Sequence, residues 1–182
     1  MDVISLFTEY KTKMQKIADV KYSLAVLQWD QETYMPAKGD LARGRQIATL
    51  SEIAHEQFTD EKTGALINEL LAKEGLNESD KRNVELSLYD YNKNKKLPSA
   101  FVRQMSEAVN KSFHAWIEAR KESSFAIFQQ PLNDIITLKR QEADMLGFEN
   151  HPYDALMNDY DKGLTVNTVD TLFASLKPQL LQ

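Results

Sequence analysis

Apolar residues recur every three or four positions along most of this 182-residue chain. That spacing aligns the apolar side chains on one face of an α-helix. No segment of convincing length alternates apolar and polar residues, as a half-buried strand would. We therefore predict an all-α fold, a multi-helix bundle of about seven or eight helices joined by short loops. The first long helix carries these apolar positions: Phe7, Tyr10, Met14, Ile17, Val20, Leu24 and Leu27.

The first helix is expected to end at a turn around residues 35–40. Met35 precedes Pro36, and a residue before proline is pushed out of the helical region. Gly39 follows and permits left-handed backbone. A second amphipathic helix then covers residues 41–58, with these core-facing positions: Leu41, Ile47, Leu50, Ile53 and Phe58.

Capping residues delimit the next two predicted helices. Thr59 is expected to cap a third helix that stops at Gly75. Asn77 is expected to cap a fourth, with Asp80 returning the hydrogen bond in an arrangement like a capping box. The fourth helix has three predicted core positions: Val84, Leu88 and Tyr91.

The second half of the chain predicts four more helices. Pro98 lies in the first turn of a helix over residues 97–122, and Pro131 is expected to begin the next one. Gly147 ends that helix, a short helix covers residues 153–160, and Thr165 caps a last one. The helix after Pro98 has these positions on one face: Val102, Met105, Val109, Phe113 and Trp116.

The length of the chain and the pattern of its last residues both indicate how it is organised into domains. A chain of this size can bury roughly 70% of its unfolded surface, so we predict a single helical domain over residues 1–182. The last residues, 180–182, lie inside an apolar periodic run without a helix stop signal. We expect the natural protein to continue beyond this point.

Composition narrows the function classes. The chain has no cysteine, which excludes disulfides, thiolate metal sites and cysteine nucleophiles. Its N-terminus lacks a positive signal-peptide region and it has no apolar run of membrane-spanning length. The net charge of −5 disfavours nucleic-acid binding. We expect a cytoplasmic protein that binds neither nucleic acid nor membrane.

Two acids, Asp30 and Glu32, lie near the C-terminal end of the first predicted helix. The helix dipole disfavours carboxylates there, so a compensating cation is expected. Arg43 and Arg45, at the start of an antiparallel second helix, can supply it through a bidentate fork. We favour a structural pair of Asp30 with one of these arginines over a general acid/base couple of the two acids. Two side chains are expected to pack beneath the pair: Trp29 and Met35.

The histidines give no metal motif. His55-Glu56 has the start of a zinc helix, but the position four residues after His55 is Thr59 instead of a second histidine. We expect His55 to form a hydrogen bond near a helix C-terminus. His114 is interpreted as a side chain at the edge of the core, and His151 as part of a loop in which Asp154 can cap the following helix. We therefore assign no catalytic and no metal-binding residue.

Four motifs in this order resemble those of the carboxypeptidase Taq family of metallocarboxypeptidases. The first is "LQWDQETYMPAKGDLARGRQIATLSEIAHE" and the others are "WIEARKESSFAIFQQPL", "RQEADMLGF" and "HPYDALMNDYDKGLT". Together they cover nearly the whole chain. The residues that carry the resemblance are Trp29, Asp30, Thr33, Met35, Pro36, Arg43, Arg45, His55, Glu56, Trp116, Arg120, His151, Pro152, Tyr153 and Asp154.

The resemblance implies the N-terminal helical region of a larger cytoplasmic peptidase that removes residues from the C-termini of peptides. Such enzymes use zinc or another divalent metal, such as cobalt or manganese, and work as homodimers. Their His-Glu-x-x-His helix is absent from residues 1–182, so no metal is expected in this segment and the segment itself is expected to be inactive. Two alternatives stay open: a free-standing helical interaction module, and a related helical zinc peptidase with a different cleavage specificity.

Overall fold

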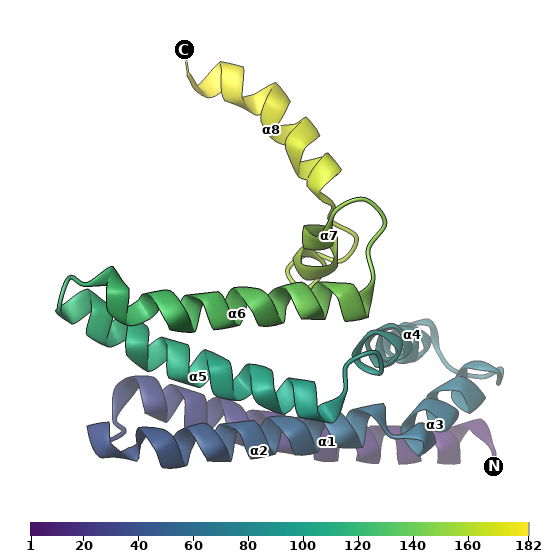
Figure 1. Ribbon diagram of the computed structural model, residues 1–182. Coiled ribbons are helices and arrows are strands. Elements are labelled where there is room, and N and C mark those ends of the chain that lie inside the picture. The colour runs from purple at the N-terminus through teal and green to yellow at the C-terminus, as the bar shows by residue number, and fades with distance from the viewer. Residues whose placement is uncertain (182) are drawn as a thin grey trace. The chain divides into compact units, whose positions relative to one another are not determined.

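The computed structural model describes residues 1–181 as eight α-helices and one short 3₁₀-helix, with no strand among them (Figure 1). This confirms the predicted all-α fold. Gln182, which the last predicted helix included, lies outside the described residues. The elements are α1 (Val3–Thr33), η1 (Ala37–Gly39), α2 (Asp40–Thr59), α3 (Glu61–Leu71), α4 (Glu78–Asn94), α5 (Ser99–Lys121), α6 (Phe125–Leu146), α7 (Pro152–Met157) and α8 (Val166–Leu180).

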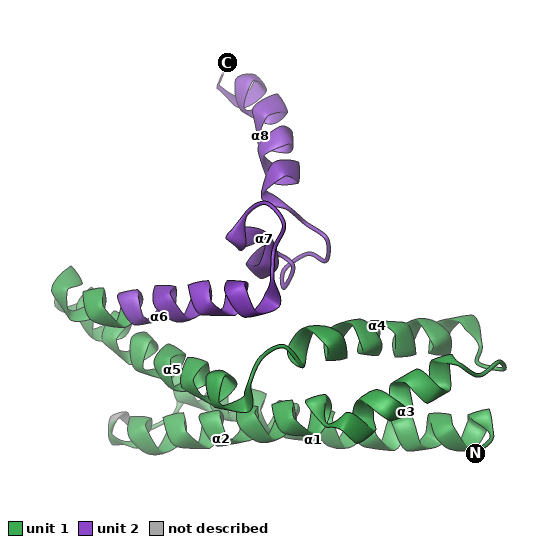
Figure 2. Cartoon of the chain, turned by 45° about the vertical axis from the view of Figure 1, so that its right-hand side comes forward, with its two compact units in different colours: residues 1–131 green, residues 132–182 purple. Residues whose placement is uncertain are grey.

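The described chain divides into two compact units, Met1–Pro131 and Leu132–Gln182, so that the division falls within α6 (Figure 2). The first unit contains α1 to α5 and the start of α6. The second contains the rest of α6 with α7 and α8. The single domain expected over residues 1–182 stays a prediction.

The core of the first unit lies where the first half of α1 meets α2, α3 and α4. Asp2 begins α1 by accepting a hydrogen bond from the Ser5 N–H at 2.9 Å, which satisfies one of the free amides of the first turn. This hydrogen bond also lowers the pKa of Asp2. The buried core residues are Leu6, Tyr10, Ile17, Phe58, Leu66, Ile67, Leu70, Val84 and Tyr91.

Helix α2 packs against both α1 and α5. Gly44 of α2 is buried, and a Cβ added there would lie 2.6 Å from Asn110 Oδ1 of α5. Arg103 of α5 donates to the Glu52 carboxylate of α2 at 2.8 Å, which raises the pKa of that guanidinium. The two helices are therefore held in close contact by a glycine at one point and an ion pair at another.

In the second unit, residues close together in the sequence form the caps that end α6 and begin α8. Gly147 adopts φ +79° after α6, and its N–H donates to the Ala143 carbonyl, which is the predicted glycine helix stop. Thr165 accepts from the Thr168 N–H at 3.2 Å and begins α8, as predicted. Helix α8 has no buried residue.

Some helix ends and helix faces differ from the predictions. Thr59 is the last residue of α2 and does not cap α3, because its hydroxyl donates to the His55 carbonyl of its own helix. Pro131 does not begin a helix but lies inside α6. Leu41 is 81% exposed instead of core-facing, and the predicted face of α5 leaves Val109 and Trp116 about half exposed. The predicted cap of α4 is confirmed: Asn77 Oδ1 accepts from the Asp80 N–H, and Asn77 Nδ2 donates to the Asp80 carboxylate.

Candidate functional site

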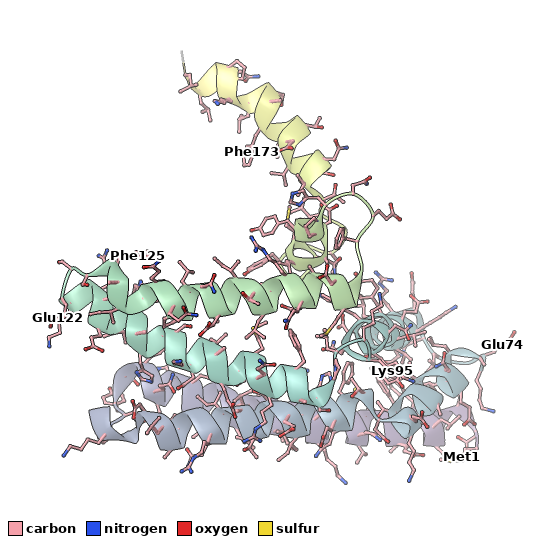
Figure 3. The ribbon with its side chains drawn as sticks, viewed as in Figure 1. Met1, Glu74, Lys95, Glu122, Phe125 and Phe173 are labelled. Carbon is pink, nitrogen blue, oxygen red and sulfur yellow. The ribbon has the colours of Figure 1, made fainter. Side chains whose placement is uncertain are left out.

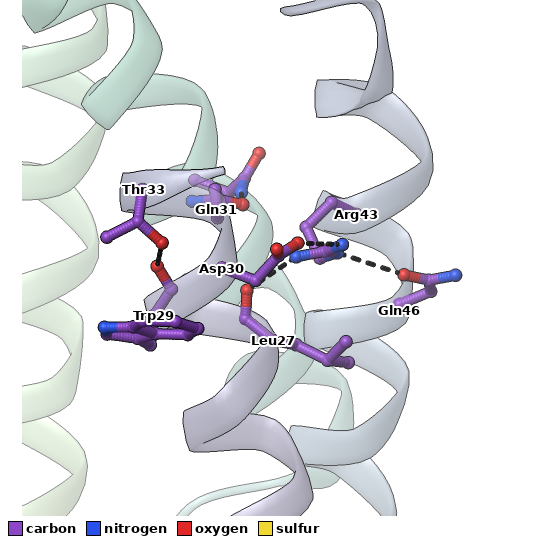
Figure 4. Close-up of polar contacts among 8 residues, drawn as sticks. Leu27, Trp29, Asp30, Gln31, Thr33, Arg43 and Gln46 are labelled. Carbon is purple, nitrogen blue, oxygen red and sulfur yellow. Dashed lines mark hydrogen bonds and ion pairs between the residues drawn. The ribbon is translucent and has the colours of Figure 1, made fainter. Parts of the chain in front are cut away.

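The corner between α1 and α2 contains the ion pair that the sequence predicts (Figure 4). Arg43 Nη2 lies 2.6 Å from Asp30 Oδ2, and the Arg43 side chain is only 15% exposed. Arg43 Nη1 also donates to the Leu27 carbonyl at 2.7 Å, and its Nε donates to Gln46 at 3.3 Å. The guanidinium thus divides its donors between the Asp30 carboxylate and the Leu27 carbonyl, both on α1, in place of the expected bidentate fork.

The other residues of this corner lie differently from the prediction. Trp29 does not pack beneath the ion pair: it is 58% exposed and contacts Tyr34 edge to face. Met35 is half-buried, and its side chain lies against Gly39. Glu32 and Arg45 are exposed and form no ion pair within residues 1–181.

Backbone hydrogen bonds shape the turn that joins the two helices. The Thr33 hydroxyl donates to the Trp29 carbonyl at 2.7 Å in the last turn of α1. The Met35 N–H donates to the Asp30 carbonyl. Pro36 precedes η1, and the Pro36 carbonyl accepts from the Gly39 N–H. Asp30 therefore stabilises the corner through its main chain as well as its side chain.

A groove of about 470 Å³ lies beside this corner, between α1, α2 and α5. Part of its lining is apolar and comes mainly from Val102, Met105, Val109 and Phe113 of α5. Its polar lining includes the side-chain amides of Asn110 and Gln31, which are hydrogen-bonded to each other: Asn110 Nδ2 donates to Gln31 Oε1 at 2.6 Å. Glu32 also lines the groove. Sequence reasoning missed this groove, although it did identify the apolar face of α5.

His55 forms a hydrogen bond near the C-terminal end of α2, as predicted. It is buried on α2, and its Nε2 lies 2.8 Å from the Leu97 carbonyl in the loop before α5. Because a carbonyl only accepts, Nε2 carries the hydrogen and donates it. Glu56, the second residue of the His-Glu pair, is exposed.

His151 and Asp154 form a capping box at the start of α7, where Pro152 is the first helical residue. His151 Nδ1 accepts from the Tyr153 N–H at 3.1 Å, and Asp154 accepts from the His151 N–H at 3.3 Å. This second bond is the predicted role of Asp154 at the start of α7, the helix that follows the loop. Asp154 also accepts from the Val166 N–H, the first residue of α8, at 2.7 Å. Tyr153 is exposed.

The third group of motif residues lies at the hairpin between α5 and α6. Trp116 and Arg120 line a second hollow, of about 490 Å³, together with residues that follow the hairpin. His114, two residues before Trp116, is half-buried, as expected for the edge of the core, and its Nε2 is buried without a hydrogen-bond partner in the structure.

The motif residues that these helices position match one protein family. The model of the carboxypeptidase Taq (M32) metallopeptidase family matches residues 9–182. The chain belongs to the M32 family. This confirms the resemblance that the four motifs carry.

Known M32 proteins resemble the chain over almost all of its length. Carboxypeptidase 1 of Bacillus subtilis is 30% identical over 182 residues, and thermostable carboxypeptidase 1 of Pyrococcus furiosus is 32% identical over 168 residues. The solved structure described as the BsuCP crystal structure covers 96% of the chain with a TM-score of 0.92 and 31% identity. The chain spans only 36% and 34% of the length of those two curated relatives.

A metallopeptidase family implies a divalent metal, but the residues of this chain do not fit one. Throughout residues 1–181, no group of three or more His, Asp or Glu side chains is placed to hold a metal ion. His55 Nε2 is occupied by the Leu97 carbonyl, and His151 Nδ1 by the Tyr153 N–H. Within the same residues, none of the helices has the length and apolar character needed to cross a membrane.

Proposed function

We propose that the chain forms the N-terminal helical region of a metal-dependent carboxypeptidase that removes residues from peptide C-termini. The match of residues 9–182 to the M32 metallopeptidase family carries this proposal. The chain spans only about a third of the length of its relatives. A metal-binding helix can therefore lie elsewhere in the protein. In this proposal, residues 1–182 supply structure and the remainder supplies the metal ligands.

The metal of the whole enzyme is proposed to be zinc or another divalent ion such as cobalt or manganese. The whole enzyme is further proposed to be a cytoplasmic homodimer that acts on peptides and binds no nucleic acid. The net charge of −5 supports the last point, since clustered positive charge drives nucleic-acid binding.

Within such an enzyme, the groove between α1, α2 and α5 is proposed to form part of the wall of the substrate channel. An extended peptide presents N–H donors and carbonyl acceptors along its backbone. The amide side chains of Gln28, Gln31 and Asn110 can pair with both kinds of group, and the apolar lining can accommodate side chains. The groove therefore suits a peptide better than a phosphorylated or polyanionic ligand.

A chimeric enzyme tests the proposed function. Residues 1–182 replace the aligned third of Bacillus subtilis carboxypeptidase 1, and release of amino acids from peptide C-termini is measured with and without a chelator. Release that the chelator abolishes is the expected result. A folded chimera with stoichiometric metal that cleaves peptides internally, or cleaves none, would contradict the proposal.

A further inference from the structure

The groove between α1, α2 and α5 carries its charge on one side chain, Glu32. Its lining residues come from all three helices, whose side chains project into the space between them (Figure 3). Among these lining residues, all of which lie within residues 1–181, Glu32 alone is charged and none is Lys, Arg or His. The groove therefore presents a negative charge to a ligand that enters it.

The arginines of the adjoining helices do not offset this charge. Arg43 of α2 is paired with Asp30 at 2.6 Å, and Arg103 of α5 is paired with Glu52 of α2 at 2.8 Å. Neither arginine lines the groove, and neither does the exposed Arg45. A cation that binds in the groove meets the carboxylate without a competing positive charge in the lining.

The position of Glu32 on α1 acts in the same direction as its charge. Glu32 lies in the last turn of α1, which ends at Thr33 and has no basic residue in that turn. The C-terminal end of a helix carries a partial negative charge, which favours a nearby cation. The carboxylate and the helix end thus both favour a positively charged group at this end of the groove.

The same charges exclude one part of a substrate peptide. A carboxypeptidase has to bind the terminal carboxylate of its substrate, which is recognised best by a cation such as arginine. The groove offers no cation, and Glu32 would repel a second carboxylate. It suits instead the part of the peptide before its last residue, whose backbone can pair with the amides of Gln31 and Asn110. Apolar side chains of that part can contact Met105 and Phe113.

We propose that the groove is a subsite for a lysine or arginine side chain that precedes the C-terminal residue of the peptide, and that Glu32 selects it. This inference deepens the proposed function and rests on it, because it takes the groove as part of the substrate channel. Glu32 is exposed, so the preference is modest, about two- to fivefold over an uncharged side chain. It weakens as salt screens the pair.

Peptide binding to the purified 182-residue chain, measured by fluorescence anisotropy, tests the subsite. The peptides are blocked at both ends, share one apolar sequence, and carry Lys, Gln or Glu at a single central position. The expected order of affinity is Lys, then Gln, then Glu. Glu32→Gln should remove most of the difference between the Lys and Glu peptides, and Glu32→Lys should reverse it.

Glu56→Gln is the matched control, because it removes the same charge from an exposed position of α2 that does not line the groove. It should leave the order of affinity unchanged, and circular dichroism verifies that each variant is folded. No binding of any peptide, equal affinity for the Lys and Glu peptides, or a preference that survives Glu32→Gln would each overturn the subsite. A gain from unblocking the N-terminus of the Gln peptide that equals the gain from lysine would assign the groove to a terminal amine, which also overturns it.

The chimeric enzyme described above separates this inference from the proposed function. In an active chimera, lysine before the C-terminal residue should raise kcat/KM in a manner that depends on Glu32, and a gain only from lysine at the C-terminal position would overturn the subsite alone. A chain that prefers the Lys peptide through Glu32, together with a folded, metal-loaded chimera that releases no amino acids, would leave a peptide-binding groove standing and contradict the carboxypeptidase.

Discussion

Arg43 reaches from α2 to both the Asp30 carboxylate and the Leu27 carbonyl of α1, at 2.6 and 2.7 Å. Replacing Arg43 with Met is predicted to destabilise the chain by about 1–2 kcal/mol, because it removes a charge-assisted hydrogen bond and leaves a partly buried carboxylate without its partner. Urea unfolding followed by circular dichroism measures the change.

Two further variants test the cause of that loss. Arg43→Lys keeps the charge, but a single ammonium group cannot replace the two separate nitrogens that reach the Asp30 carboxylate and the Leu27 carbonyl. It should therefore restore only part of the stability. Arg45→Met, on the same helix but exposed, should change stability by less than about 0.5 kcal/mol. Equal losses in Arg43→Met and Arg45→Met would contradict a specific role for the ion pair.

Replacing His55 with Ala is predicted to destabilise the chain by about 1–3 kcal/mol, because it empties a buried position and removes the hydrogen bond to Leu97. The exposed neighbour Glu56 provides the control, and Glu56→Ala should be nearly neutral. Thermal and urea unfolding both report the difference. An unchanged stability in His55→Ala would mean that this hydrogen bond does not hold α2 to the loop before α5.

Gly64 lies on α3 directly against Tyr91 of α4, and an added Cβ would overlap the tyrosine ring. Glycine to alanine inside a helix normally stabilises by about 1 kcal/mol. At this position the overlap should dominate, and Gly64→Ala is predicted to destabilise by about 1–3 kcal/mol. Urea unfolding measures it. In the background Tyr91→Leu the same change should cost clearly less, and an equal cost in both backgrounds would exclude overlap with the ring as the cause.

Lys13 donates to Asp60 at 3.0 Å, which lowers the pKa of Asp60 from its ordinary value of 3.8. A carboxyl whose pKa is lowered on folding stabilises the protein above its unfolded pKa and loses that contribution as the pH falls through the folded pKa. Asp60→Asn is therefore predicted to lower the urea midpoint near neutral pH and to have progressively less effect below pH 3.8. A difference that persists unchanged into strong acid would contradict this linkage.

Helix positions could be predicted because the three-and-four spacing of apolar residues persists wherever a helix packs on a core. Helix ends were harder, since they depend on competition between local hydrogen bonds. Thr59 resembles a cap in the sequence, but its hydroxyl bonds within α2. Pro131 resembles a helix start, yet α6 already begins at Phe125, and the Pro131 carbonyl accepts a hydrogen bond from Ser112 at 3.1 Å.

The candidate site was predictable only where partners are close in the sequence. Asp30 and Arg43 are separated by a single turn, so their pairing followed from the helix dipole and chain geometry. The exposure of Trp29 did not follow, because an aromatic residue beside an ion pair has no sequence signal for which side it faces. The hollow at Arg120 depends on the reversal at Ser123, which periodicity does not encode.

In the function proposed above, residues 1–182 supply structure and bind no catalytic metal. The most direct test is the metal content of the purified 182-residue chain after incubation with zinc and gel filtration, measured by mass spectrometry together with release of amino acids from a peptide C-terminus. We expect well under one zinc per chain and no release above background. One tightly bound zinc per chain with chelator-sensitive release would contradict it.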